Sequence, residues 1–217
     1  MCIAIWKPHG ATVDEKTLTK CFNTNKDGAG FMYARNGKVC IYKGFFELDR
    51  FLKALAKHTP LADAAGSGMA IHCRIKTHGK TDVHNCHPHR VVGYNMAFIH
   101  NGVIHLNGYN ANTGESDSID FCRRVLYHLP TNWLEFPMIR TLVADFIGRY
   151  NKVVFMDSTG KVHIINEDQG EWSKGVWYSN SGYKTFTTRR VFTHGRDGTG
   201  GGAYGYQHGA ADSCDNS

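Results

Sequence analysis

Short β-like runs separated by turn dipeptides dominate the first 165 residues of the chain, and they constrain the fold more than any other feature. Asn36-Gly37 and Thr159-Gly160 each join two such runs and are typical of β-hairpins. We expect strands at residues 1–6, 30–34, 38–43, 68–75, 94–100, 150–156 and 161–165. Because hairpins outnumber strand–helix–strand crossovers, the sheets are expected to be mainly antiparallel.

Apolar residues at helical spacing interrupt the strands in two places. The first stripe ends near residue 58 and consists of Phe46, Phe51, Leu52 and Leu55. The second follows Ser116 and consists of Ile119, Cys122, Val125 and Leu126. A third helix is expected after Trp133. Amphipathic helices beside antiparallel sheets predict an α+β fold in which the helices cover the outer faces.

The composition fits one globular domain of ordinary size, with 217 residues, 41% apolar and 20% charged. No apolar stretch is long enough for a membrane span, and no secretion signal is visible, so we expect no membrane partner. From Gly195 the chain is rich in glycine and almost lacks aliphatic side chains. We therefore expect a disordered tail at 195–217.

The cysteines form an odd and scattered set, which is typical of reduced thiols and not of a disulfide framework. They lie at positions 2, 21, 40, 73, 86, 122 and 214. We accordingly expect a cytoplasmic protein. The net charge is +6, and the 25 basic residues are spread along the chain, so the sequence does not support nucleic-acid binding.

Cys2 is the most suggestive single residue. Removal of Met1 would leave a thiol and a free α-amine on one residue. Thiolate is the attacking form of cysteine, and an α-amine with a pKa of about 7.7 to 8.0 can accept the thiol proton near neutral pH. Taken alone, however, the position is more typical of a small buried cysteine.

A second cluster of chemically active side chains lies between residues 72 and 89, which hold five histidines and two cysteines. This composition raises the hypothesis of a zinc-binding His/Cys module. The spacing argues against it, because Cys73 and Cys86 are each unpaired, whereas structural zinc sites usually pair their ligands two to four residues apart.

Five motifs in this chain come in the order and approximate spacing of class II glutamine amidotransferase domains. They are Cys2, His-x-Arg-x-x-Thr-His-Gly at 72–79, Asn-x-His-Pro at 85–88, His-Asn-Gly at 100–102 and Ser-Asp-Ser at 116–118. The chain resembles a stand-alone form of this glutaminase domain over residues 2–190. The resemblance implies the fold of the N-terminal nucleophile (Ntn) hydrolases, a four-layer αββα sandwich of two mainly antiparallel sheets flanked by helices.

The resemblance also implies a catalytic role for three residues. Cys2 matches the nucleophile that attacks the side-chain amide carbon of glutamine and forms a γ-glutamyl thioester. Asn101 and Gly102 match the donors that stabilise the oxyanion, through a side-chain amide and a backbone N–H respectively. From the residues alone, Asn101-Gly102 is more typical of a hairpin turn between apolar runs, although a turn at a strand end can also present an amide donor.

Four further residues match the family's substrate-binding positions. Arg74 matches the arginine that grips the carboxylate of glutamine, with help from Thr77 and His78. Asp117 matches the acid that binds the ammonium group. Alone, Arg74 would more often form a surface ion pair, and Asp117 could simply be an acidic residue at a helix start.

The resemblance implies a glutaminase that releases glutamate and ammonia, needs no cofactor or metal, and either supplies a separate synthase or acts alone. Ile3 departs from the family pattern, which usually has glycine after the nucleophile. An alternative is a catalytically silent glutamine-binding or interaction module with the same fold, and the zinc module is a minor alternative.

Overall fold

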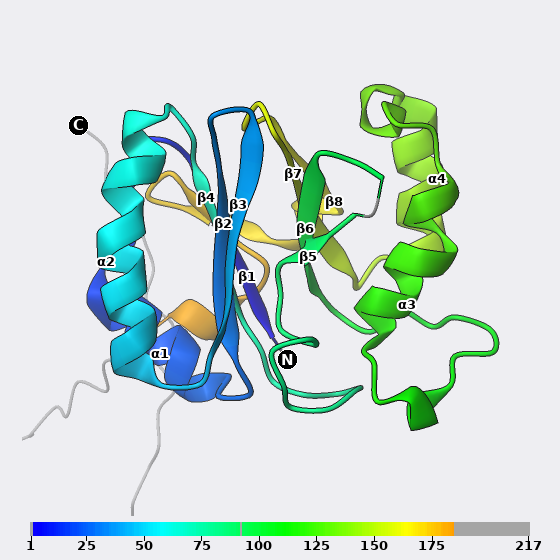
Figure 1. The fold of residues 1–217 in the computed structure, drawn as a ribbon, viewed down its shortest axis with the longest axis horizontal. Helices are drawn as coiled ribbons and strands as arrows, with labels where there is room; N and C mark the ends of the chain where they lie inside the picture. The colour runs from blue at the N-terminus through cyan, green and yellow to red at the C-terminus, as the bar shows by residue number, and fades with distance from the viewer. Residues whose placement is uncertain (1, 92, 185–217) are drawn as a thin grey trace, which may run out of the picture. The chain divides into compact units, whose positions relative to one another are not determined.

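Two stacked β-sheets, each covered on its outer face by helices, form the part of the chain that the structure describes (Figure 1). A computed structural model describes residues 2–91 and 93–184. In the order of the layers, α1 and α2 cover the first sheet, and α3 and α4 cover the second. This arrangement confirms the predicted α+β sandwich with antiparallel sheets.

The first sheet has six strands in the order β3-β2-β4-β1-β10-β9, and every pairing is antiparallel. Its strands are β1 (Ile3–Lys7), β2 (Ala29–Arg35), β3 (Lys38–Phe45), β4 (Met69–Cys73), β9 (Glu171–Ser173) and β10 (Val176–Tyr178). The predicted Asn36-Gly37 turn joins β2 to β3, with both residues at positive φ. β1 therefore lies inside the sheet, between β4 and β10.

The second sheet has four strands in the order β5-β6-β7-β8. They are β5 (His89–Arg90), β6 (Met96–Asn101), β7 (Lys152–Asp157) and β8 (Val162–Ile165). β6 and β7 are buried along nearly their whole length, because one face meets the first sheet and the other meets the helices.

Alternation along the central strands separates the cores. On β1, Ile3 and Ile5 point to the core beneath α1 and α2, whereas Ala4 points into the layer between the sheets. On β6, Ile99 meets that same inner layer, and Phe98 points to the core under α3 and α4. Since side chains alternate across a strand, one strand supplies two cores.

The four α-helices are α1 (Glu15–Thr24), α2 (Leu48–Ala64), α3 (Asp117–Arg124) and α4 (Pro137–Ile147). The sequence predicted the last three and missed α1. Asp14 caps α1 by accepting from Thr17 N, and Leu18 and Phe22 form its buried stripe. α2 also continues past the expected end near residue 58, through Pro60, and its last turns pack Ala62 into the core.

The sequence also missed three short strands, β5, β9 and β10. Two or three residues are too few to show a period of two, so only pairing with a neighbouring strand reveals them. The expected tail at 195–217 lies outside the described residues, and the domain boundary at 190 stays a prediction. Within the described part of the chain, no helix is long and apolar enough to cross a membrane.

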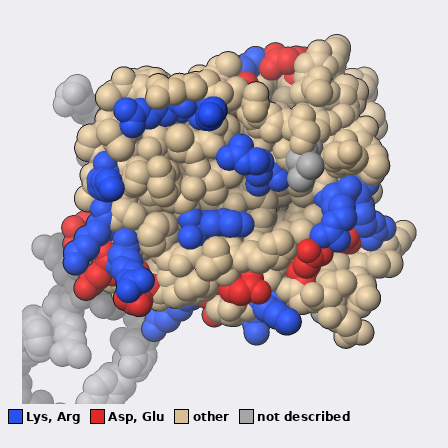
Figure 2. Space-filling view, viewed as in Figure 1, with Lys and Arg blue, Asp and Glu red and all other residues tan. Residues whose placement is uncertain are grey.

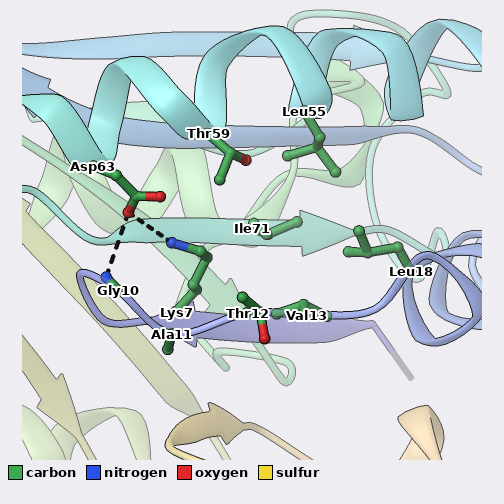
Figure 3. A pocket seen from close by; sticks show the side chains of 10 residues that line it. All are labelled: Lys7, Gly10, Ala11, Thr12, Val13, Leu18, Leu55, Thr59, Asp63 and Ile71. Carbon is green, nitrogen blue, oxygen red and sulfur yellow. Dashed lines mark hydrogen bonds and ion pairs between the residues drawn. The ribbon is translucent and has the colours of Figure 1, made fainter.

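An ion pair between a buried lysine and a partly exposed aspartate joins the end of β1 to the end of α2, beside a small cavity of about 160 Å³ (Figure 3). Lys7 Nζ lies 3.0 Å from Asp63 Oδ1, which also accepts from Gly10 N. The Lys7 side chain is only 4% exposed. Partial burial alone would raise the pKa of Asp63, but the hydrogen bond and charge of Lys7 hold it below its usual value.

We expect Asp63→Asn to lower the free energy of unfolding by about 1 to 3 kcal/mol, because it leaves the Lys7 ammonium without its counter-charge. The stabilisation from this pair is present above the ordinary carboxyl pKa of 3.8 and is lost as pH falls through the lower folded-state value. Urea unfolding at pH 7 and at pH 3 measures both effects. Asp145→Asn on the exposed side of α4 is the matched control, and an equal loss in both variants would contradict the account.

Candidate active site

Cys2 lies directly before β1, and three backbone or side-chain contacts fix its position. Its Sγ is 3.4 Å from Ile75 N and 3.3 Å from Ile75 O, and its carbonyl accepts from Asn180 Nδ2 at 2.8 Å. Ile3 packs in the core beneath the helices and does not line the neighbouring pocket. The bulk of Ile3 therefore does not obstruct the thiol.

A pocket of about 370 Å³ opens beside Cys2. It is lined by Cys2, Thr77, Asn101, Gly102, Val103, His105, Ile147, Gly148, Arg149, Tyr150 and Asn151. Four of the seven predicted site residues therefore share one pocket, although they come from three separate parts of the sequence. The volume lies within the range typical of small-molecule sites.

Asn101 ends β6 and is 1% exposed. Its Nδ2 donates to Ser179 Oγ at 2.8 Å, while its Oδ1 has no partner among the described residues. The hairpin alternative for Asn101-Gly102 is wrong, because β6 pairs with β5 and β7 and not with the segment that follows Gly102. Asn101 instead ends β6 and places an amide donor at the pocket wall.

Gly102 has a φ of +146°, and a Cβ at this position would lie 2.1 Å from Asn151 Oδ1. Only glycine fits there. His100 Nε2 lies 2.8 Å from the same oxygen, and His100 Nδ1 lies 2.8 Å from Ser118 Oγ. Because an amide oxygen can only accept, Nε2 carries the proton and Nδ1 accepts from the serine. Neutral His100 thus holds the Asn151 side chain that lies against Gly102.

Arg74 is buried, with 3% exposure, so the surface ion pair expected from the residue alone is wrong. Its guanidinium donates to His78 O at 2.7 Å and to Lys80 O at 3.0 Å. Asp27 Oδ2 accepts from Lys76 N at 2.8 Å and holds the start of the same loop. In this structure Arg74 shapes the loop over residues 76–80 and does not line the Cys2 pocket.

Two other predicted substrate residues also lie outside the pocket lining. The His78 ring packs edge-on against Tyr109, with 5.4 Å between centroids. Asp117 is the first residue of α3, as the helix-start alternative expected, but it is 5% exposed and its Oδ2 accepts from Ile104 N at 2.7 Å. Asp117 therefore anchors the loop that follows Gly102.

The charges of Arg74 and Asp117 act on the Cys2 thiol although neither residue lines the pocket. Burial raises the pKa of Cys2 above 9.0, and this effect outweighs the Ile75 hydrogen bond and the positive charge of Arg74, which lower it. The negative charge of Asp117 raises the pKa further. Arg74 and Asp117 are thus close enough to act on the thiol, and at neutral pH the thiol stays protonated unless a base takes the proton.

Three of the five histidines between residues 72 and 89 are buried, namely His72, His87 and His89. Burial lowers the pKa of His72 to about 3 and that of His87 well below its usual value, so both rings are neutral. The two rings lie 4.3 Å apart between centroids and are tilted by 46°. Cys73 lies in the core beneath the helices. The described residues contain no group of three His, Cys, Asp or Glu side chains that could hold a metal ion, so the geometry does not support the zinc alternative.

Ser179 is a site residue that sequence reasoning missed. It is fully buried, and its Oγ accepts from Ala4 N at 2.9 Å and from Asn101 Nδ2 at 2.8 Å. Asn151 and the pocket residues Arg149 and Tyr150 were missed as well. Nothing in the local sequence marks Ser179, since its role depends on the pairing of β10 with β1.

We expect Ser179→Ala to lower the free energy of unfolding by about 1 to 3 kcal/mol, because Ala4 N and Asn101 Nδ2 would both lose their buried acceptor. Ser181→Ala, two residues along the chain and exposed, should change stability by less than about 0.5 kcal/mol. Thermal and urea unfolding of both variants measure the difference. Equal stabilities would show that the hydroxyl does not hold Asn101.

Comparison with known proteins adds one partial similarity. No protein-family model matches the chain. A stretch of 87 residues, 40% of the chain, is 34% identical to part of a probable glutamine–fructose-6-phosphate aminotransferase (isomerizing) of Acanthamoeba polyphaga mimivirus. The chain spans 14% of the length of that protein. The similarity suggests a glutamine amidotransferase-like domain in this chain.

Proposed function

We propose that this protein is a class II, Ntn-type glutamine amidotransferase that hydrolyses the side-chain amide of glutamine through Cys2. The observation that carries the proposal is the shared pocket, in which the thiol of Cys2 lies with Asn101 and Gly102. The partial similarity to a glutamine-dependent aminotransferase supports the same substrate.

The proposed reaction begins after Met1 is removed. The α-amine of Cys2 takes the thiol proton, and Sγ attacks the amide carbon of glutamine. Asn101 Nδ2 and the Gly102 N–H donate to the oxyanion, and the protonated amine returns its proton to the leaving ammonia. Water then attacks the thioester, which releases glutamate and restores the thiol.

Ser179 and Asn151 support the oxyanion donors in this proposal. Ser179 Oγ uses one of the two hydrogens of Asn101 Nδ2, which leaves the other for the oxyanion. Asn151 sets the backbone at Gly102. Preorganised donors of this kind need no rearrangement when the charge develops, which is why they stabilise the transition state.

Arg74 and Asp117 supply the charges that free glutamine requires. The guanidinium has five N–H donors and commits two of its nitrogens to the carbonyls of His78 and Lys80, so donors remain for a carboxylate. Thr77, on the same loop, lines the pocket. We propose that the loop over 76–80 adjusts on binding so that Arg74 and His78 meet the carboxylate and Asp117 the ammonium group.

The second candidate is a silent glutamine-binding or interaction module with the same fold. It is favoured by the raised pKa of Cys2, which keeps the thiol protonated when no base is present. A retained Met1, seen by intact mass, would remove the base and favour this candidate. A separate ammonia-accepting synthase and a cytoplasmic location remain proposals of the glutaminase account.

We expect purified protein to release ammonia and glutamate from glutamine, either alone or once its acceptor is added. Cys2→Ala should abolish turnover, and Asn101→Ala should lower kcat by about 100- to 1000-fold, as the loss of one oxyanion donor does elsewhere. Cys40→Ala, which removes a half-buried thiol on β3, is the matched control. Turnover by Cys2→Ala at the rate of the control would refute the proposal.

The pH dependence should report the amine and not the thiol. Because burial keeps the thiol pKa above 9.0, the group that must lose a proton near neutrality is the α-amine, with an ordinary pKa of about 7.7 to 8.0. We therefore expect kcat/KM to rise with pH through about 8 and then level off. A rate that is already constant at pH 6 would instead show a thiolate of low pKa and contradict this mechanism.

A further inference from the structure

A second pocket, of about 520 Å³, lies where β3, β5 and α3 meet. It is lined by Lys43, His84, His89, Arg90, Ile119, Cys122, Arg123 and Tyr127. It shares no lining residue with the Cys2 pocket. On the face shown in Figure 2, basic side chains gather around a hollow. The proposed glutamine chemistry makes no use of this pocket.

Two cations line the pocket without a direct ion pair among the described residues. Lys43 Nζ donates to His84 O at 3.2 Å and Arg90 Nη2 to Val39 O at 2.9 Å. Neither cation meets a carboxylate within 4.0 Å in the described part of the chain, whereas Arg123 pairs with Glu115 at 2.6 Å. Burial lowers the pKa of Lys43, and the negative charge of Asp82 offsets this effect only in part.

Apolar side chains line the other side of the pocket. Ile119 and Cys122 lie on α3, and Tyr127, which also lines the pocket, is 52% exposed. An exposed aromatic ring next to an aliphatic wall suits a planar ring, which can stack on it. Inorganic phosphate would bind the two cations but leave the apolar side of the pocket exposed. An uncharged ring compound would cover the apolar side but leave the two cations without an anion.

We propose that this pocket binds a nucleoside monophosphate, with the phosphate at Lys43 and Arg90 and the base against Tyr127 and Ile119. A phosphomonoester carries a charge of about −1.5 to −2 at pH 7, which suits the two cations that lack a direct ion pair. Its oxygens accept from an ammonium and a guanidinium, the two kinds of charged donor that Lys43 and Arg90 offer.

Calorimetric titration with the four common ribonucleoside 5′-monophosphates tests the proposal. At least one should bind saturably, and its nucleoside and inorganic phosphate should each bind at least about tenfold more weakly. Lys43→Gln and Arg90→Gln should each weaken nucleotide binding by about tenfold or more. Tyr127→Ala should also weaken binding, but by a smaller factor. Lys53→Gln, an exposed lysine on α2, is the matched control.

Binding should be unchanged in Cys2→Ala, because the two pockets share no residue, so the result is independent of the glutaminase proposal. Thermal unfolding checks that each variant is folded, and Tyr127→Ala covers the case in which a charge variant fails to fold. No saturable binding of any of the four nucleotides would overturn the proposal. Equal binding by Lys43→Gln, Arg90→Gln and Lys53→Gln, or phosphate binding as tight as nucleotide binding, would overturn it as well.

Discussion

The buried hydroxyl of Ser179 joins the two sheets at the point where the candidate active site forms. Its Oγ accepts from Ala4 N in the first sheet and from Asn101 Nδ2 in the second. The backbone N–H of Ser179 donates to Ala4 O at 2.9 Å. This bond extends the pairing of β10 with β1 by one residue. This one side chain therefore holds both the backbone just after Cys2 and the Asn101 amide.

Small side chains between the sheets make this coupling possible. Ala4, Ala70 and Ala97 lie in the layer where the sheets meet and are fully buried. Polar groups lie toward the pocket end of that layer, and His72 Nε2 donates to His100 O at 2.9 Å. Because buried polar groups are costly without partners, these bonds fix one relative position of the sheets.

Local sequence patterns predicted the hairpins, the antiparallel sheets and three of the four α-helices. The Asn36-Gly37 turn is correct because two positive φ values suffice to specify it. The short strands depend on pairing with residues far away in the sequence, so local patterns did not predict them. β10 has three residues and no visible period, so neither its place beside β1 nor the role of Ser179 could be inferred.

The sequence predicted which residues come together at the candidate pocket better than it predicted their contacts. Cys2 and Asn101 do share a pocket. Arg74 looked like a surface cation, but it is buried against carbonyls of its own loop, and Asp117 serves as a backbone acceptor. Side-chain partners across 13 or more residues, such as Asp117 and Ile104, leave no local mark in the sequence.

The proposed reaction depends on Cys2 as an N-terminal nucleophile in a pocket that binds glutamine. Labelling with a glutamine-mimicking electrophile, followed by mass analysis of the modified peptide, tests processing, pocket and nucleophilicity together. We expect one adduct, on residue 2 of protein that has lost Met1, and protection of this residue by added glutamine. Labelling spread over other cysteines, or an unmodified Cys2 in protein without Met1, would contradict it.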